Sequence, residues 1–231
     1  MAKHIGIVAC SAEGSAFFYR AVCAEAPKHM GEHMHPEITM HTYPLGVYKG
    51  PISAGDWAEV ARLMSSSARK LADAGADFAV CPDNTNHQAF DLVVKDSPIP
   101  WLHIAEVVAQ EAKTLGFERV AILGTKHLMT GPVYSEALKR SGIAYEIPEE
   151  EEREKLDQIV FTELAKGIFT EESRLYLNEV IQHLKNRGCD AAALACMELP
   201  MLVDSDDCPL PTLDPTHLLA MAALREALRE D

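Results

Sequence analysis

The sequence predicts an α/β fold of two pseudo-symmetric halves, each with a mostly parallel sheet, and a cleft between them. Short apolar runs alternate with longer segments of helical periodicity, which is the pattern of βαβ units. The segment 74–87 (AGADFAVCPDNTNH) is also echoed by the segment 187–200 (RGCDAAALACMELP). A repeated order of segments indicates an internal duplication of one unit.

The individual elements support this prediction. Strands are expected where apolar residues are short and continuous, at 5–9, 37–41, 77–80 and 120–124. Helices are expected at 15–26, after the N-cap Asp56, from the acidic run 149–152, and behind Asp214 and Pro215 at the end of the chain.

We expect two domains from this order of elements. The first half comprises residues 1–105 together with the C-terminal helix at 214–231, and the second half comprises residues 106–213. No linker rich in Gly or Ser separates them.

The composition excludes several classes of protein. A formal net charge of -14 argues against a nucleic-acid partner, because such proteins present a basic surface. No apolar run is long enough to span a membrane, and the first residues do not form a signal peptide, so we expect a soluble, cytoplasmic protein. The six cysteines contain no CxxC pair, which favours neither a zinc site nor a disulfide framework.

Two turns carry the candidate chemistry. Asp83 follows the strand at 77–80, and Cys196 holds the equivalent position in the echoed segment. Structural roles are open to both residues: Asp83 or Asn84 as a helix cap, and Cys196 as a small buried hydrophobe. The functional alternative is an acid and a thiol that transfer protons to opposite sides of one carbon, with the thiol beside the first amides of a helix.

Several stretches together resemble the aspartate/glutamate racemase superfamily, the cofactor-independent racemases, and most closely its aspartate racemase branch. The resemblance rests on IGIVACSAEGSAFFYR, DNTNH, VAILGTK, IVFTELAKGIF, CMELPML and LDPTHLLA. It implies an isomerase that needs no organic cofactor or metal, acts on aspartate or glutamate, and often forms a homodimer.

The resemblance also implies roles for particular residues. Each turn carries a proton-transfer residue, here Asp83 in place of the first cysteine and Cys196 as the second. Further residues are implied to bind the substrate: Asn84 and Thr85 at the α-carboxylate, Lys166 at the distal carboxylate, and Ser11 and Thr125 in the two loops that line the cleft. From its position two residues after Cys196, Glu198 either holds an amino group or caps its own helix.

The sequence departs from the family pattern at several positions. Cys81 is expected deeper in the strand that leads to Asp83, and Met197 stands where the family tends to have threonine. An arginine of some relatives is missing, with Tyr48 or Lys49 as its stand-in.

An aspartate unbalances a mechanism with two proton-transfer groups. With ordinary pKa values of about 3.9 and 8.5, protonated Asp83 with charged Cys196 lies roughly 6 kcal/mol above the reverse state. Burial of Asp83 and helix amides beside Cys196 would narrow this difference.

Three functions therefore stay open. The first is a racemase or epimerase of an acidic amino acid. The second is a decarboxylase, lyase or isomerase of a small dicarboxylate that uses Cys196 alone. The third is a catalytically silent protein that binds a carboxylate.

Several histidines and a lysine are secondary candidates. His33 and His35 have the spacing of a metal pair, although a solvated loop is the stronger interpretation. His87 is either a hydrogen-bonding residue behind the site or a plain helix residue, and Lys126 with His127 would add positive potential for a dianionic substrate.

Overall fold

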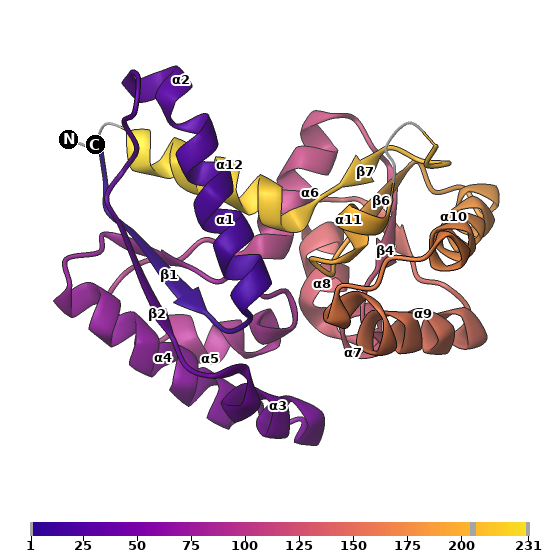
Figure 1. Cartoon of the computed structure of the whole chain (residues 1–231), viewed down its shortest axis with the longest axis horizontal. Helices are drawn as coiled ribbons and strands as arrows, with labels where there is room; N and C mark the ends of the chain where they lie inside the picture. The colour runs from indigo at the N-terminus through magenta and orange to yellow at the C-terminus, as the bar shows by residue number, and fades with distance from the viewer. Residues whose placement is uncertain (1, 204–206, 230–231) are drawn as a thin grey trace. The chain divides into compact units, whose positions relative to one another are not determined.

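The computed structural model describes residues 2–203 and 207–229 and divides into two compact units (Figure 1). Unit 1 contains Met1–Val107 and Thr216–Asp231, and unit 2 contains Val108–Pro215. Each unit is built around one sheet whose strand pairs are all parallel in the described residues, so the predicted α/β class is confirmed. That the two units are separate domains stays a prediction.

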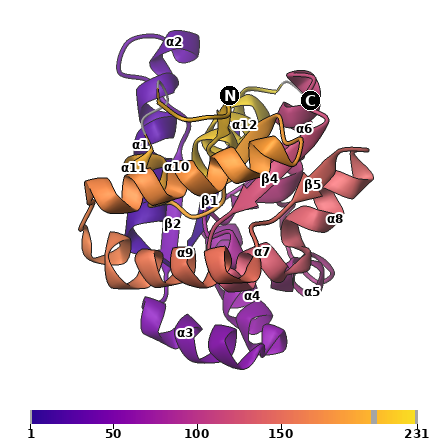
Figure 2. The same ribbon diagram turned by 90° about the vertical axis from the view of Figure 1, so that its right-hand side faces the viewer.

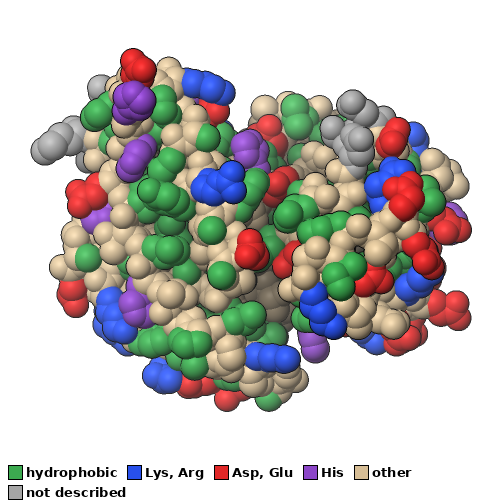
Figure 3. All heavy atoms as spheres, viewed as in Figure 1, with side chains coloured by type: hydrophobic (Ala, Val, Ile, Leu, Met, Phe, Trp, Pro, Cys, Tyr) green, Lys and Arg blue, Asp and Glu red, His purple; other side chains and the backbone are tan. Residues whose placement is uncertain are grey.

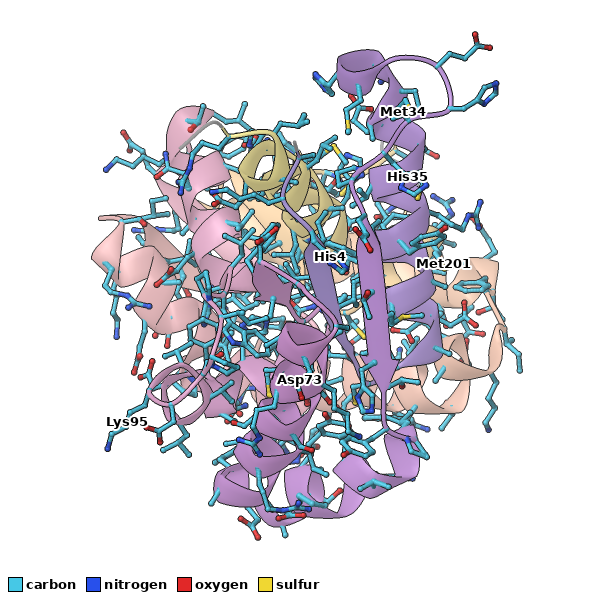
Figure 4. All side chains as sticks on the ribbon, turned by 90° about the vertical axis from the view of Figure 1, so that its left-hand side faces the viewer. His4, Met34, His35, Asp73, Lys95 and Met201 are labelled. Carbon is cyan, nitrogen blue, oxygen red and sulfur yellow. The ribbon has the colours of Figure 1, made fainter. Side chains whose placement is uncertain are left out.

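The sheet of unit 1 has its first strand in the centre. The order is β2-β1-β3, and Ile5 pairs with Ile38 on one side and with Phe78 on the other. The strands match the predicted runs to within a residue or two: β1 (Ile5–Ala9), β2 (Ile38–Thr42) and β3 (Phe78–Val80). Figure 4 labels His4 at the start of β1, where its Nε2 lies 2.8 Å from Thr39 Oγ1 of β2.

Helices cover both faces of this sheet, because side chains along β1 alternate between them. Ile5, Ile7 and Ala9 pack against α1 (Ala12–Glu25), the start of α6 (Ile104–Thr114) and α12 (Pro215–Leu228). Val8 and the opposite face pack against α3 (Leu45–Ala54), α4 (Trp57–Asp73) and α5 (Phe90–Val94). The short α2 (Pro27–Met30) follows α1.

The predicted cap of α4 is confirmed. Asp56 Oδ1 accepts a hydrogen bond from Glu59 N at 3.0 Å, and the preceding Gly55 has a φ of 67°. A carboxylate at this position satisfies a backbone donor that the helix itself leaves unpaired.

Unit 2 repeats the arrangement with one more strand. Its sheet has the order β5-β4-β6-β7. The strands are β4 (Arg119–Leu123), β5 (Ala144–Glu146), β6 (Ala191–Leu194) and β7 (Thr212–Leu213). One face is covered by α9 (Glu150–Thr162) and α10 (Glu171–Asn186), which lie side by side in Figure 2. The shorter helices are α7 (Lys126–Thr130), α8 (Pro132–Arg140) and α11 (Leu199–Leu202).

The acidic run at the start of α9 forms a capping box, which confirms it as a helix start. Glu149 is the N-cap, and the Glu152 side chain accepts from Glu149 N at 2.9 Å. Acidic residues are favourable here because the amino end of a helix carries partial positive charge.

The two sheets share a hydrogen-bond pattern that fixes their strand pairing. An aspartate before the third strand accepts backbone N–H bonds at the start of the central strand: His4 N to Asp77 Oδ2 at 2.6 Å in unit 1, and Glu118 N to Asp190 Oδ2 at 2.7 Å in unit 2. A glycine with a φ of 91° lies two residues before each aspartate, at Gly75 and at Gly188. This equivalence supports the predicted duplication.

Asp190→Ala is expected to destabilise the protein. Asp190 also accepts from Arg119 N at 3.1 Å, so the variant leaves two backbone donors without their carboxylate. We expect the free energy of unfolding to fall by about 1 to 2 kcal/mol in urea titrations. The exposed Asp96→Ala variant is the control and should change little; an equal loss in both variants would contradict this role.

Candidate active site

Strand register makes Asp83 and Cys196 equivalent positions of the two units. Ile5 pairs with Phe78 in unit 1, and Val120 pairs with Ala191 in unit 2. Asp83 lies five residues after Phe78, and Cys196 lies five residues after Ala191. Each side chain therefore follows the carboxyl end of a strand next to the central one, where open parallel sheets bind their ligands.

Asp83 is half-buried and held by the amino end of α1. Its Oδ2 accepts a hydrogen bond from Ser11 N at 3.1 Å, and Ser11 is the N-cap of that helix. A carboxylate that accepts a backbone N–H is stabilised in its charged form. Ser11 therefore contacts Asp83 through its backbone N–H. The sequence alone did not predict this contact.

Of the two predicted caps, Asn84 is the N-cap residue by position, but its side chain makes no capping hydrogen bond. The turn continues into a 3-10 helix, Thr85–Ala89, and only then into α5. Asn84 occupies its N-cap position without a side-chain capping hydrogen bond, and Asp83 bonds Ser11 instead. Asn84 is buried and Thr85 is half-buried beside Asp83 in sequence.

Two thiols lie buried behind Asp83. The strand ends at Val80, so Cys81 lies one residue beyond it, and its predicted place within the strand is wrong. Burial, followed by the negative charge of Asp83, raises the pKa of both Cys81 and Cys10 far above its ordinary value. Both groups are therefore held as neutral thiols.

His87 is a buried residue that fixes the same turn. Its Nε2 lies 2.9 Å from the Cys81 carbonyl oxygen and donates to it, since a carbonyl only accepts. The ring stacks on Phe90 at 5.4 Å and meets His103 edge-on at 4.6 Å. Burial, and secondly His103, lowers the pKa of His87 to about 3. Of the two predicted roles, the structure favours the hydrogen-bonding residue.

Cys196 is half-buried and bonded to its neighbour two residues along. Its Sγ donates to Glu198 Oε2 at 2.9 Å. Glu198 is the N-cap residue of α11 by position, but its side chain makes no capping hydrogen bond. Because α11 has only four residues, the effect that was expected of helix amides on Cys196 stays a prediction without a long helix to support it.

The polar groups of the loop after β4 bond to other residues of unit 2. The Thr125 side chain accepts from Leu128 N at 3.4 Å and caps α7. Lys126 N donates to Asp157 Oδ1 at 2.7 Å, while its Nζ pairs with Glu154 at 2.9 Å. The ion pair offsets the positive potential that was expected from Lys126.

Lys166 and the two stand-ins for the missing arginine differ in exposure. Lys166 ends the 3-10 helix Leu164–Lys166 and is exposed, as is Lys49. Tyr48 is fully buried inside unit 1, so it is not a stand-in for a ligand-binding arginine.

Neither a metal site nor a membrane segment was found in the part of the chain that the structure describes. No three His, Cys, Asp or Glu side chains of residues 2–203 and 207–229 are grouped as metal ligands. His35, labelled in Figure 4, has its Nδ1 2.8 Å from the Pro36 carbonyl oxygen. No described helix has the length and apolar character to cross a bilayer. Acidic and basic side chains are interspersed on the face in Figure 3.

A groove of about 760 Å³ lies in unit 2 at the opposite, amino edge of the sheet. Its lining includes Arg119, Gly142 and Asp190. Asp190 uses both carboxylate oxygens to hold the start of β4, so the polar groups there serve the fold.

Sequence reasoning missed the contacts of Asn86. Its Nδ2 lies 3.8 Å from Cys81 Sγ, and the same side chain is near enough to Cys10 to affect the pKa of that thiol. The order of the strands, with β1 in the centre, brings the residues after β1 and β3 together, and the sequence carried no local signal for this order.

The fold and the paired turns define a class of two-unit α/β proteins with one candidate reactive side chain per unit. The family model for Asp/Glu/Hydantoin racemase matches residues 5–223. The chain therefore belongs to the Asp/Glu/hydantoin racemase family, and the predicted resemblance is confirmed at this level.

Individual relatives agree with this assignment. The broad specificity amino-acid racemase RacX of Bacillus subtilis (strain 168) is 23% identical over 194 residues, covering 82% of this chain and 81% of the relative. A candidate Asp/Glu racemase from Yersinia pestis superposes with a TM-score of 0.92 at 29% identity, covering 98% of this chain and 100% of that one. An aspartate racemase homologue from Pyrococcus horikoshii OT3 gives 0.86 at 25% identity, covering 99% and 100%.

The low pKa of His87 predicts a loss of stability in acid. The folded protein excludes a proton that the unfolded chain binds below about 6.5, the ordinary histidine value. The free energy of unfolding should therefore fall as the pH drops from 6.5 towards 3, with a slope of up to about 1.4 kcal/mol per pH unit.

Urea titrations over this pH range measure the slope. His87→Gln should flatten it, while the exposed His33→Gln should not. Equal slopes in the wild type and in His87→Gln would contradict the assignment.

Proposed function

We propose that this protein is a cofactor-independent amino-acid racemase of the aspartate racemase type, acting on aspartate or glutamate. Asp83 and Cys196 are its two proton-transfer groups. The observation that carries the proposal is the strand register, which makes these residues equivalents of one another in the two units. Family membership supports the reaction class.

The local hydrogen bonds are consistent with these roles of Asp83 and Cys196. Asp83, oriented by Ser11 N, is the carboxylate that removes the α-proton. Cys196 Sγ–H is the donor to the other side of the carbon, and Glu198 orients this thiol. The reverse reaction exchanges the roles of Asp83 and Cys196. Asn84 and Thr85 would hold the α-carboxylate, and Lys166 the distal carboxylate.

The same hydrogen bonds leave the two protonation states unequal. The Ser11 N–H favours a charged Asp83, and a carboxylate next to Cys196 favours its neutral thiol. They do not narrow the difference of roughly 6 kcal/mol expected from ordinary pKa values. After each removal of a proton by Asp83, the enzyme must therefore return to its resting state by exchanging protons with solvent.

This inequality favours one alternative function. A permanently charged Asp83 would hold or activate a substrate, while Cys196 alone would act as acid or nucleophile in a decarboxylase, lyase or isomerase of a small dicarboxylate. Product analysis with malonates and maleate separates this function from racemisation. A silent carboxylate-binding protein would show ligand affinity without turnover.

Exchange of the substrate α-proton with solvent tests the proposed reaction directly. Proton NMR in heavy water with L-aspartate, and separately with L-glutamate, should show loss of the α-proton signal and formation of the D enantiomer. Asp83→Asn and Cys196→Ala should each lower the rate by about 10²- to 10⁴-fold, because each removes one proton-transfer group.

Matched controls separate this effect from general damage. The exposed Asp91→Asn in unit 1 and the half-buried Cys208→Ala in unit 2 should keep the wild-type rate. Absence of solvent deuterium at the α-carbon of both amino acids would refute the proposal for these substrates.

The variant Asp83→Cys gives both turns the thiol that the family resemblance implies. Two thiols have similar ordinary pKa values, so the return step should become faster. We expect a higher kcat and a smaller difference in kcat between the two enantiomers. Unchanged or lower kcat in a folded variant would show that Asp83 does not limit the reaction.

A further inference from the structure

Several buried polar side-chain atoms in unit 1 lack partners among the described residues, and two of them belong to Tyr48 and Asn86. Tyr48 OH and Asn86 Oδ1 are each inaccessible to solvent and make no hydrogen bond with another described residue. The residues themselves are 0% and 1% exposed. Buried polar groups are nearly always paired, and an internal water molecule is the usual partner where protein atoms are missing.

Both side chains lie near the two buried thiols, Cys10 and Cys81. Asn86 Nδ2 lies 3.8 Å from Cys81 Sγ. Tyr48 packs in the same buried cluster as Cys10 and Cys81, and the negative charge of Asp83 reaches the tyrosine and both thiols. A hydroxyl, an amide and two thiols are therefore buried in this part of unit 1, and an internal water molecule needs two or more polar partners of this kind.

A hydrogen-bonded chain leads from the buried Ser67 to the surface. Lys70 Nζ lies 2.9 Å from His41 Nε2, and His41 Nδ1 lies 2.9 Å from Ser67 Oγ. A lysine ammonium only donates, so Nε2 accepts and Nδ1–H donates to Ser67. The hydroxyl hydrogen of Ser67 is then available to a further acceptor.

Ser67 brings this chain to Tyr48. The serine is fully buried in α4, and it is close enough to Tyr48 to lower the pKa of the phenol, against the larger rise caused by burial. The two oxygens are not in hydrogen-bond geometry in the structure. A small rotation of either hydroxyl, or a bridging water molecule, would connect them.

We propose that Tyr48 and Asn86 hold an internal water molecule, and that this water, with Tyr48, Ser67 and His41, is the route by which Asp83 exchanges its proton with solvent. The inference rests on the proposed function, because only a group that receives the substrate proton needs such a route. It explains a fully buried tyrosine hydroxyl that the apolar packing of the cluster does not require.

The proton transfer balances at each step. In the resting arrangement His41 carries its hydrogen on Nδ1, so the route conducts only after the contact with Lys70 opens and His41 exchanges with solvent to the tautomer with hydrogen on Nε2. Protonated Asp83 then gives its proton to the water, the water passes one to Tyr48 O, Tyr48 passes its own to Ser67 Oγ, and Ser67 passes its own to His41 Nδ1. The imidazolium releases its Nε2 proton to solvent, which restores the resting tautomer. The water and the two hydroxyl groups end with the number of hydrogens with which they began.

Crystal structures of the whole protein that resolve water test the binding site without any need for activity. The wild type should show a water within hydrogen-bond distance of Tyr48 OH and Asn86 Oδ1, and Tyr48→Phe, which keeps the ring, should lose it. Ser66→Ala is the matched control, since Ser66 Oγ bonds Tyr43 OH at 2.9 Å from the same helix. An empty site in the wild type, or an unchanged water in Tyr48→Phe, would overturn the proposal.

An isotope experiment tests the route. The experiment follows, in heavy water, the enantiomer from which Asp83 removes the α-proton. When the reverse reaction forms this enantiomer again, Asp83 supplies the α-hydrogen. In the wild type this hydrogen should be deuterium, because Asp83 has by then exchanged its proton with solvent. In Tyr48→Phe and Ser67→Ala, the protium retained in this enantiomer should rise several-fold, with no rise in Ser66→Ala. Equal retention in all four proteins would overturn the route.

The two experiments separate this inference from the proposed function. If the wild type does not exchange the α-proton of any amino acid tested, the proposed function and the route both fail, while the crystal structures still decide the water site. If exchange occurs and the variants match the wild type, the function stands and the route fails.

Discussion

The parallel pairing of the central strand with the strand beside it is the constraint on which the rest of each unit depends. An aspartate fixes this pairing by binding backbone N–H groups at the start of the central strand, through Asp77 in unit 1 and Asp190 in unit 2. Once the pairing is fixed, the turn that follows is fixed too, because it lies a constant number of residues beyond. The position of each candidate reactive side chain is thus set at the opposite end of the strand.

The two turns are equivalent in position but opposite in chemistry. In unit 1 a carboxylate is held by a backbone donor, and in unit 2 a thiol is held by a carboxylate. Each hydrogen bond stabilises the resting form of its group, so the pair is not balanced in the way two thiols would be. An enzyme with such a pair needs an efficient path for the proton that the acid has taken. The buried polar side chains of Tyr48 and Asn86 belong to the same unit as that acid.

Much of the fold follows from local sequence signals. The strands at 5–9, 37–41 and 77–80 and the start of the helix after Asp56 were predicted to within a residue or two, because each is marked by an apolar run or a cap. The two turns do lead into helical elements, as predicted, but the first of these elements are short. They are a short 3-10 helix and a single turn, because the chain there has little apolar periodicity to bury.

By itself, the sequence determined the α/β class, the repeat of one unit and the equivalence of Asp83 with Cys196, because these depend on periodicity and spacing along the chain. Only the tertiary structure decided the partners. The hydrogen bond from Ser11 to Asp83 joins residues far apart in the sequence, and the burial of Tyr48 depends on α3 packing against the sheet. Contacts of this kind are set by strand pairing and by the packing of helices on a sheet, and no local pattern encodes them.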